Sequence, residues 1–498
     1  MHECYYLGLD QGTTGTTAIL FDRQWNAVSR GYEQIPLLYP RSGWVEHDAR
    51  AVWTSVLSST AQALSQIGAE ASSIRCIGLN HEGESVVVWD KLTGEPIYNT
   101  IVWQDRRTAH YADSLTDQYN GLVRGKTGLM IDSYFSATKL KWILDHAEGA
   151  GELAAKGRLL AGTMDSWIIW KMTHGRTHVT DASTASRTML FNLESGDWDQ
   201  ELLDLFELDR SLLPEVCDSA AVYAWTDPLD FLGAQIPISG ILVDQQAALV
   251  GQACVQPGMV KTTYGTGCFM LMNTGETPVF SESGLLPTVA WQLSGKRTYA
   301  LDGGVYITGG ATRWLQESLN LVEDPRDTEP LALQVPDNGG VYFVPAFTGL
   351  AAPHWDSYAS GMVIGITGGT RKAHIVRAAL EATCYQVRDV LDVMCRDSNV
   401  PITAMRCNGR ATANRFLMQF QSDILDLPLE IPEHADTTAF GSAFMGALGL
   451  GEFESIGDAA QLWRSEHRFE PRMDASRREH LLYHWHRAVE RSKYWRED

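Results

Sequence analysis

Short apolar runs alternate with longer amphipathic stretches along the whole chain, a pattern typical of an α/β fold. Residues 6–9 form one such run, and residues 18–21 form the next. Between them lies the segment DQGTTG at residues 10–15, which is rich in glycine and threonine. Two apolar runs joined by a segment of this kind predict a strand, a turn and a returning strand.

The same arrangement returns in the middle of the chain. Residues 260–263 are mostly β-branched, the segment YGTG covers residues 264–267, and residues 268–272 form the returning run. Because the two turns begin about half a chain length apart, we expect two related domains that face a cleft. Two unrelated hairpins are the alternative. We place the domains at residues 1–246 and 247–498, since no long flexible linker separates them.

The second half of the chain also shows a clear helical pattern. Five apolar residues recur at steps of four and three, which places them on one buried helix face: Leu380, Cys384, Val387, Leu391 and Met394. Residues 441–451 are rich in small side chains. For this segment we expect a helix that packs closely against a neighbour.

Composition limits the possible partners. The 498 residues include 40 lysines and arginines against 61 acidic residues, so the formal net charge is −21. This charge argues against nucleic acid or an anionic membrane as the main partner. The eight cysteines include no CxxC pair, so neither a zinc site nor a disulfide framework is indicated. No leader is recognisable at the start and no apolar stretch approaches 18 residues, so we expect a cytoplasmic protein without a membrane partner.

The two Gly-Thr turns and two aspartates are the candidate chemical groups. Glycines let backbone N–H groups approach an anion, and threonine hydroxyls add donors, so both turns are candidate phosphate sites. Asp10 beside the first turn is placed to orient Mg²⁺ through water. Asp244 follows an apolar run and is a candidate general base for a hydroxyl group. The alternatives are ordinary hairpin turns that need glycine and an aspartate that caps a turn.

Aromatic residues gather in the first half of the chain, at Trp89, Tyr98, Trp103, Tyr134 and Phe135. Aromatic rings beside carboxylates hold small polyols, because C–H faces pack on the rings while hydroxyls bond to acids and amides. Packing in the core is the alternative for each of them.

Long segments of the sequence resemble one family. They are GLDQGTTGTTAILFD, GWVEHDARAVW, VVVWDKLTGEPIYNTIVWQDRRT, DSYFSATKLKWILDH, DQQAALVGQACVQPGMVKTTYGTGCFMLMNTG, VYFVPAFTGLAAPHWD and FLMQFQSDIL. On these segments the chain resembles the FGGY carbohydrate kinases from about residue 5 to about residue 490, and within them the glycerol-phosphorylating members. The resemblance implies an actin-like, ribonuclease-H-like fold of two domains with a central cleft. It also implies ATP with Mg²⁺ as phosphoryl donor and a small polyol as acceptor.

The matching segments assign roles to individual residues. Asp244 matches the family's catalytic base, and Asp10 matches its metal-side aspartate. The positions matched to the polyol pocket are Gly83, Glu84, Trp103, Tyr134, Asp244, Gln245 and Phe269. The positions matched to the phosphates or the nucleoside are Thr13, Thr14, Gly265, Thr266, Gly309, Arg313, Arg410 and Asn414.

Four positions depart from the family pattern. Gly83 stands before Glu84 where the glycerol-phosphorylating members usually carry an arginine that binds glycerol hydroxyls. Thr17 replaces an arginine after the first turn, and Arg313 replaces a glutamine near the nucleotide. Arg410 replaces the second glycine of an Asp-Gly-Gly segment, where it would narrow the nucleoside site or stack on the base.

The expected activity is ATP-dependent phosphorylation of a small polyol. Overall likeness favours glycerol, with glycerol 3-phosphate and ADP as products. The loss of the arginine at residue 83 favours a longer acceptor, namely a tetritol, a pentitol or a related ketose. A degenerate regulator that binds nucleotide or polyol without catalysis is the other alternative. We expect small-molecule partners and a homo-oligomer, either a dimer or a tetramer.

Overall fold

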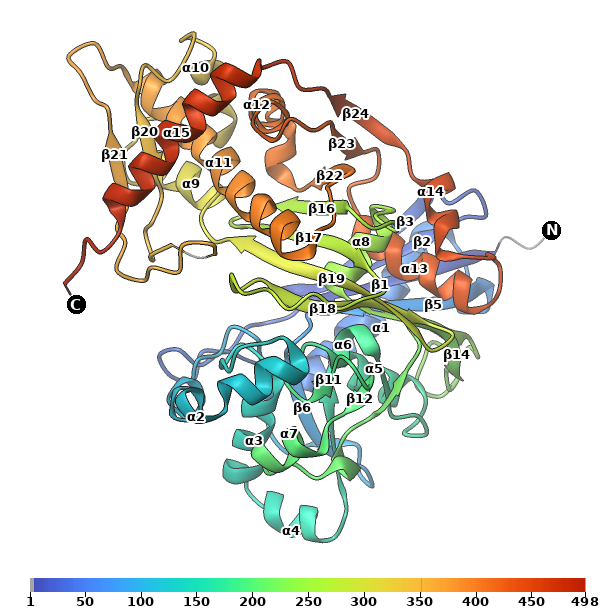
Figure 1. The fold of residues 1–498 in the computed structure, drawn as a ribbon. Helices are drawn as coiled ribbons and strands as arrows, with labels where there is room; N and C mark the ends of the chain where they lie inside the picture. Colours follow the sequence, from blue (N-terminus) through green and yellow to red (C-terminus); the bar gives the residue numbers. More distant parts are fainter. Residues whose placement is uncertain (1–3, 351, 498) are drawn as a thin grey trace.

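The computed structural model describes residues 4–350 and 352–497, and it contains two large mixed sheets with helices packed around them (Figure 1). The N-terminal sheet has the order β14-β15-β5-β1-β2-β3. Its strands are β1 (Tyr5–Gly12), β2 (Gly15–Phe21), β3 (Ala27–Gln34), β5 (Ile74–His81), β14 (Ala220–Trp225) and β15 (Pro237–Val243).

The C-terminal sheet has the order β18-β19-β17-β16-β22-β23-β24. Its strands are β16 (Met259–Tyr264), β17 (Cys268–Gly275), β18 (Leu286–Leu293), β19 (Lys296–Val305), β22 (Ala404–Asn408), β23 (Leu429–Pro432) and β24 (Ser465–Phe469). Both predicted hairpins are therefore confirmed, as β1–β2 and β16–β17.

The two sheets repeat one arrangement, as the paired turns indicate. In each, an antiparallel three-strand meander is followed by two parallel strands: β3-β2-β1-β5-β15 in one sheet and β19-β17-β16-β22-β23 in the other. This repetition supports two related halves. It also confirms the predicted α/β class.

Helices cover both sheets, and two of them were predicted. The spaced apolar residues 380–394 lie buried on α11 (Lys372–Ser398). The small-residue segment belongs to α13 (Thr437–Gly449), which packs on the N-terminal sheet. A Cβ atom added to Gly78 would lie 1.7 Å from the Ser442 carbonyl oxygen, and one added to Gly441 would lie 1.9 Å from the Ala247 oxygen. Glycine at these positions therefore permits the close approach that was expected.

The N-terminal half also contains a smaller lobe of short strands and helices (Figure 1). Its sheet joins β4 (Glu46–His47), β6 (Val86–Asp90), β7 (Glu95–Pro96), β8 (Thr100–Ile101) and β9 (Leu159–Thr163). The helices nearby are α2 (Ala109–Thr127), α3 (Ser136–His146), α4 (Ala150–Ala155), α5 (Met164–Met172), α6 (Ala182–Ala185) and α7 (Gln200–Leu205).

Three two-stranded sheets complete the strands. They pair β10 (Val179–Asp181) with β13 (Glu215–Cys217), β11 (Phe191–Asn192) with β12 (Asp197–Trp198), and β20 (Tyr342–Val344) with β21 (Met362–Ile364).

The remaining helices flank the two large sheets. They are α1 (Ala49–Ile67), α8 (Asp244–Gly251), α9 (Gly309–Glu317), α10 (Thr328–Ala332), α12 (Arg415–Leu425), α14 (Ala459–Leu462) and α15 (Ala475–Ser492). Among the described residues, no helix combines the length and apolar character that a bilayer span requires.

Candidate active site

Three parallel strands of the N-terminal sheet end at the same edge and bring acidic residues together. Asp10 lies near the end of β1, opposite Asn80 of β5. The segment Glu82-Gly83-Glu84 follows β5, and Asp244 follows β15 as the first residue of α8. His81 and Val243 are register partners, so the residues after them start side by side.

Asp244 is held by its neighbour in the helix. The Gln245 backbone N–H donates to Asp244 Oδ1 (2.6 Å), and the Gln245 amide donates to Oδ2 (3.2 Å). The Lys261 ammonium on β16 in turn donates to Gln245 Oε1 and to Thr263 Oγ1 (3.2 Å). Burial raises the pKa of Asp244, and the positive charge of Lys261 and the Gln245 hydrogen bonds oppose that rise. An ionised carboxylate with a raised pKa suits a general base.

Asp10 lies within electrostatic range of Asp244. Burial, and then the negative charges of Asp244 and Asp436, raise the pKa of Asp10 to about 7. Two carboxylates held close together in a buried place favour a bound cation, because a cation relieves both the repulsion and the desolvation.

The two Gly-Thr turns present exposed backbone. Thr14 at the β1–β2 turn is exposed, and the Trp103 indole N–H donates to Thr13 Oγ1 (2.9 Å). Gly265 and Thr266 at the β16–β17 turn are exposed as well. The Gly265 N–H donates to the Gly267 carbonyl oxygen within its turn (2.8 Å), so the exposed backbone and threonine side chains of the two turns are the parts that a ligand can reach.

Helix α9 begins directly on the second turn. The Gly309 N–H donates to the Gly265 carbonyl oxygen (3.2 Å), and the Gly310 N–H donates to the Thr266 oxygen (3.1 Å). A Cβ atom at Gly309 would lie 2.5 Å from the Gly265 oxygen, so glycine is needed for this contact. The structure thus brings Gly309 to the turn residues, which the spacing of the motifs alone did not predict.

Aromatic and charged side chains surround Glu84 and form a candidate acceptor pocket. The Trp103 and Tyr134 rings meet edge to face at 5.8 Å. Arg187 donates to Glu84 Oε1 (2.7 Å), and its guanidinium lies 5.9 Å from the Tyr134 ring centre. Burial raises the pKa of Glu84, and the Arg187 charge opposes this. Phe269 on β17, in the C-terminal half, is 41% exposed and packs against Gly304.

Two of the grouped aromatic residues do not belong to this pocket. Trp89 is fully buried and packs on Trp167 at 5.3 Å, so for this residue the core interpretation is correct. The Tyr98 hydroxyl donates to Glu46 (2.9 Å) in a separate polar cluster with Arg107. Residue type alone cannot separate these tryptophans and tyrosines, because strand direction decides which side chains face the pocket.

The residues on the nucleoside side lie at the surface of the C-terminal half. Arg313 on α9 and Arg410 after β22 are exposed. Asn414 caps α12, since its side chain accepts from the Leu417 N–H (2.9 Å) and donates to Thr328 Oγ1 (3.3 Å). Gly409 has φ +100° and lies against the Tyr264 backbone, so it turns the chain sharply just before Arg410.

Sequence reasoning missed the buried cations of the site. Arg187, Lys139 and Lys261 are 4%, 0% and 0% exposed. Lys139 donates to the Tyr134 and Phe135 carbonyl oxygens, and burial lowers its pKa to about 7. A lysine inside the predicted strand 260–263 was an available signal, because a charged side chain within a buried strand needs a partner.

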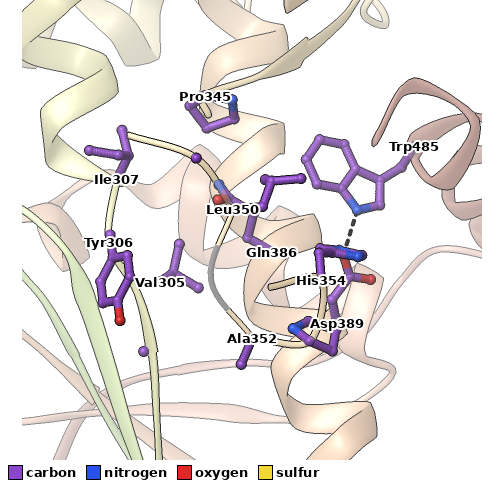
Figure 2. A pocket seen from close by; sticks show the side chains of 13 residues that line it. Val305, Tyr306, Ile307, Pro345, Leu350, Ala352, His354, Gln386, Asp389 and Trp485 are labelled. Atoms are coloured by element: carbon purple, nitrogen blue, oxygen red, sulfur yellow. Dashed lines mark hydrogen bonds and ion pairs between the residues drawn. The ribbon is translucent and has the colours of Figure 1, made fainter. Parts of the chain in front are cut away.

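A small pocket elsewhere in the C-terminal half contains none of the residues singled out from the sequence (Figure 2). It lies beside the residues that link β19 to α9, and the Trp485 indole N–H donates to Asp389 there (2.8 Å). Asp10 and Asp244 do not line it. The converging strand ends therefore remain the candidate active site.

Family models match almost the whole chain. The N-terminal domain model of the FGGY family of carbohydrate kinases matches residues 5–251, and the C-terminal domain model of that family matches residues 260–450. The chain belongs to the FGGY family of carbohydrate kinases.

Curated relatives and solved structures agree with this assignment. The chain is 51% identical to "Glycerol kinase 2" of Thermotoga maritima over 99% of each chain, and 51% identical to the glycerol kinase of Bacillus licheniformis over 98% of each. The crystal structure of Plasmodium falciparum glycerol kinase with ADP has a TM-score of 0.94 at 32% identity and covers 98% of each chain. The expected two-domain FGGY fold is confirmed.

The departure from the FGGY pattern at Gly83 has a structural basis. Gly83 has φ +63°, a left-handed conformation that other residues rarely adopt. A Cβ atom there would contact only Val243 Cγ2, at 3.4 Å, so the space beside the backbone is open. The neighbouring Glu82 is buried with neither carboxylate oxygen hydrogen-bonded, and His47 Nε2 lies 3.7 Å from Oε1. Burial raises the pKa of Glu82 to about 7.

Thr17, the second departure, is buried on β2 and paired with Asp10 of β1. Its side chain therefore does not extend toward solvent beside the turn as a long cation would.

Proposed function

We propose that this chain transfers the γ-phosphoryl group of ATP to a hydroxyl group of a small polyol, with glycerol as the first candidate acceptor. The observation that carries the proposal is Asp244, a half-buried carboxylate at a strand end, which is within electrostatic range of Glu84 and Asp10. The relatives at 51% identity that are named glycerol kinase support glycerol as the acceptor, and the solved glycerol kinase with ADP supports an adenine nucleotide as the donor.

Asp244 would accept the proton of the attacking hydroxyl group. Phosphoryl transfer needs mainly positioning and charge stabilisation, so a correctly placed base and well-held phosphates are sufficient. Gln245 orients the Asp244 carboxylate and offers its amide beside the acceptor. Closure of the two halves excludes water, which would otherwise compete as an acceptor.

Phosphate groups would lie between the two turns. Thr13 and Thr14 from the first turn and Gly265 and Thr266 from the second supply backbone and hydroxyl donors. Asp10 fits a Mg²⁺ ion bound through phosphates and water, because Mg²⁺ prefers carboxylates and retains water ligands. The ion would neutralise the charge that develops on the phosphates. The nucleoside would extend toward Gly309, Arg313, Arg410 and Asn414.

The acceptor would bind between Glu84, Tyr134, Trp103, Gln245 and Phe269. Glu84 would accept hydrogen bonds from the acceptor hydroxyls, while Arg187 donates to Glu84 Oε1. The aromatic rings would pack on the C–H faces of the acceptor. Gly83 contributes space and no side-chain donor.

A longer polyol or a related ketose is the second candidate acceptor, and the open space at Gly83 favours it. We expect erythritol, threitol or xylitol to have a kcat/KM at or above that of glycerol. Without an arginine at residue 83, glycerol loses a guanidinium contact worth about 1.5–3 kcal/mol, or roughly 10- to 150-fold in kcat/KM. A longer polyol can instead fill the space that the arginine would occupy. Steady-state kinetics on the four polyols measures this. A kcat/KM for glycerol far above that of the three longer polyols, together with a low KM for glycerol, would refute a wider acceptor pocket. Replacement of Gly83 with arginine is a poor test, since φ +63° would strain it.

Nucleotide binding should depend on both turns. Thr14→Val and Thr266→Val each remove a hydroxyl with little change of shape, and we expect each to weaken ATP binding by about 3- to 10-fold, the equivalent of one hydrogen bond. Calorimetric titration with a non-hydrolysable ATP analogue measures the effect. Thr116→Val on α2, which removes only a local helix contact, is the matched control. Unchanged titrations for both turn variants would contradict a phosphate site between the turns.

The proposal is tested by measuring ADP release with ATP, Mg²⁺ and each polyol in turn. Acceptor-dependent ADP release supports a kinase. Binding of nucleotide without release would favour the degenerate regulator. We further propose domains at residues 1–246 and 247–498, a homo-oligomer of two or four chains and a cytoplasmic location.

A further inference from the structure

The strand that follows the first Gly-Thr turn carries no cation at residue 17. Thr17 stands where the FGGY pattern has an arginine, and it is buried on β2 between Asp10 of β1 and Tyr32 of β3. A nucleotide at this turn would bring the negative charges of its phosphates close to the Asp10 carboxylate. Phosphate sites commonly offset such charge with an arginine or a lysine as well as a metal ion.

Arg30 lies on the same face of the N-terminal sheet as Asp10. Asp10, Thr17 and Tyr32 are register partners across β1, β2 and β3, and Arg30 is two residues from Tyr32 on β3. Because side chains of a strand alternate between the two faces, all four project from one face. Burial and neighbouring carboxylates raise the pKa of Asp10, and the positive charge of Arg30 opposes them, so Arg30 lies within electrostatic range of Asp10.

The Tyr32 ring connects Arg30 to the first turn. The Arg30 guanidinium lies 5.9 Å from the centre of this ring. At the end of the ring, the Tyr32 hydroxyl donates to the Thr14 carbonyl oxygen (3.2 Å). A Cβ atom at Gly15 would lie 2.6 Å from the same hydroxyl oxygen, so the ring rests directly on the turn. The guanidinium is therefore separated by one aromatic ring from Thr14, a residue of the proposed phosphate site.

The Arg30 guanidinium also has donors available for a ligand. It pairs with Asp436, the residue before α13, at 3.8 Å, and the two side chains are 53% and 46% exposed. An ion pair this long and this exposed contributes little and rearranges easily. No residue in the described part of the chain accepts a hydrogen bond from this guanidinium. Since a guanidinium presents five donors in a planar fork, it can stay beside Asp436 and still bind a phosphate.

We propose that Arg30 binds the phosphate groups of the nucleotide at the first Gly-Thr turn and supplies, from β3, the positive charge that Thr17 does not. This inference rests on the proposed nucleotide site between the two turns. Its ligand is a nucleoside polyphosphate, and the contact is made to the phosphates alone.

The test compares Arg30→Gln, which removes the charge, with the matched control Arg75→Gln. The Arg75 side chain is 57% exposed and pairs with Glu452 (2.7 Å), and it lies near the start of β5, at the opposite end of that strand from the register partner of Asp10. Calorimetric titrations with adenosine, ADP and a non-hydrolysable ATP analogue, each with Mg²⁺, measure binding without turnover. We expect R30Q to weaken binding of the ATP analogue about tenfold, binding of ADP less, and binding of adenosine by no more than about twofold. R75Q should change none of the three affinities by more than about twofold.

The outcomes separate the inference from the proposed function. A wild type that binds neither ADP nor the ATP analogue would refute the proposed function, and the inference with it. A wild type that binds both, with R30Q and R75Q indistinguishable, would refute the inference alone. An equal loss for adenosine and the ATP analogue in R30Q would also refute it, because a general disturbance of the site does not depend on the number of phosphates.

Thermal melting shows whether R30Q folds. If it does not, Arg30→Lys replaces it, because a single ammonium cannot bridge Asp436 and a phosphate as a guanidinium does. A loss of about threefold for the ATP analogue, with adenosine unchanged, is then expected. Unchanged affinities of R30K for both ligands would refute the inference.

Discussion

Replacement of Asp244 with asparagine is expected to lower kcat by about 10²- to 10⁴-fold, the usual contribution of a general base. Asparagine retains the shape and still accepts a hydrogen bond from the Gln245 N–H, but it cannot take the hydroxyl proton. Steady-state assays with saturating ATP and polyol measure the loss.

Binding and folding should survive this change. Because burial raises the pKa of Asp244, the folded protein does not gain stability from its charge, and D244N should melt at or above the wild-type temperature. Calorimetry should show near-normal affinity for an ATP analogue. Asp392→Asn, on the exposed side of α11, is a control for carboxylate removal as such. Near-normal kcat in D244N would show that Asp244 is not the base.

Asp10→Asn is expected to have opposite effects on activity and stability. The apparent affinity for Mg²⁺ should fall about 10- to 100-fold, as for other residues that orient a metal through water. A titration of activity against Mg²⁺ at fixed ATP measures this loss. In the wild type, the apparent affinity for Mg²⁺ should weaken as the pH falls, because burial raises the pKa of Asp10 and the proton competes with the ion for the carboxylate.

The free energy of unfolding of the ligand-free protein should rise in D10N. The pKa of Asp10 is raised from 3.8 to about 7, so the ionised carboxylate destabilises the folded state progressively as pH rises from about 4 to 7. At pH 8 the neutral asparagine should therefore stabilise the protein, by up to about 4 kcal/mol, and the gain should vanish below about pH 4. Thermal melts across this range measure it, with D392N as control. If D10N were less stable than the wild type at pH 8, this would contradict the claim that the ionised Asp10 carboxylate destabilises the folded state.

Local patterns predicted the hairpins because a Gly-Thr turn between two apolar runs marks them, and predicted α11 because a period of 3.6 residues follows directly from helix geometry. The two Gly-Thr turns were found for the same reason, since glycine and threonine mark them locally. Arg187 and Glu84 are 103 residues apart in sequence, and no local pattern joins them. Their contact depends on how α6 and the end of β5 pack.

Which aromatic residues lie near the candidate site could not be predicted from the sequence, for a similar reason. Trp89 and Trp103 are the same residue type in neighbouring segments, yet one lies in the core and the other binds Thr13 at the turn. The sequence marked Gly83 as a lost side chain. Only the backbone angle shows that the segment adopts a conformation suited to glycine.

The most direct test of the account is product identification by phosphorus NMR after incubation with ATP, Mg²⁺ and glycerol or a longer polyol. The account predicts a polyol monophosphate phosphorylated on a hydroxyl group, formed in step with ADP by the wild type and nearly absent with D244N. Inorganic phosphate as the only new product, or equal polyol phosphate from the wild type and D244N, would contradict it.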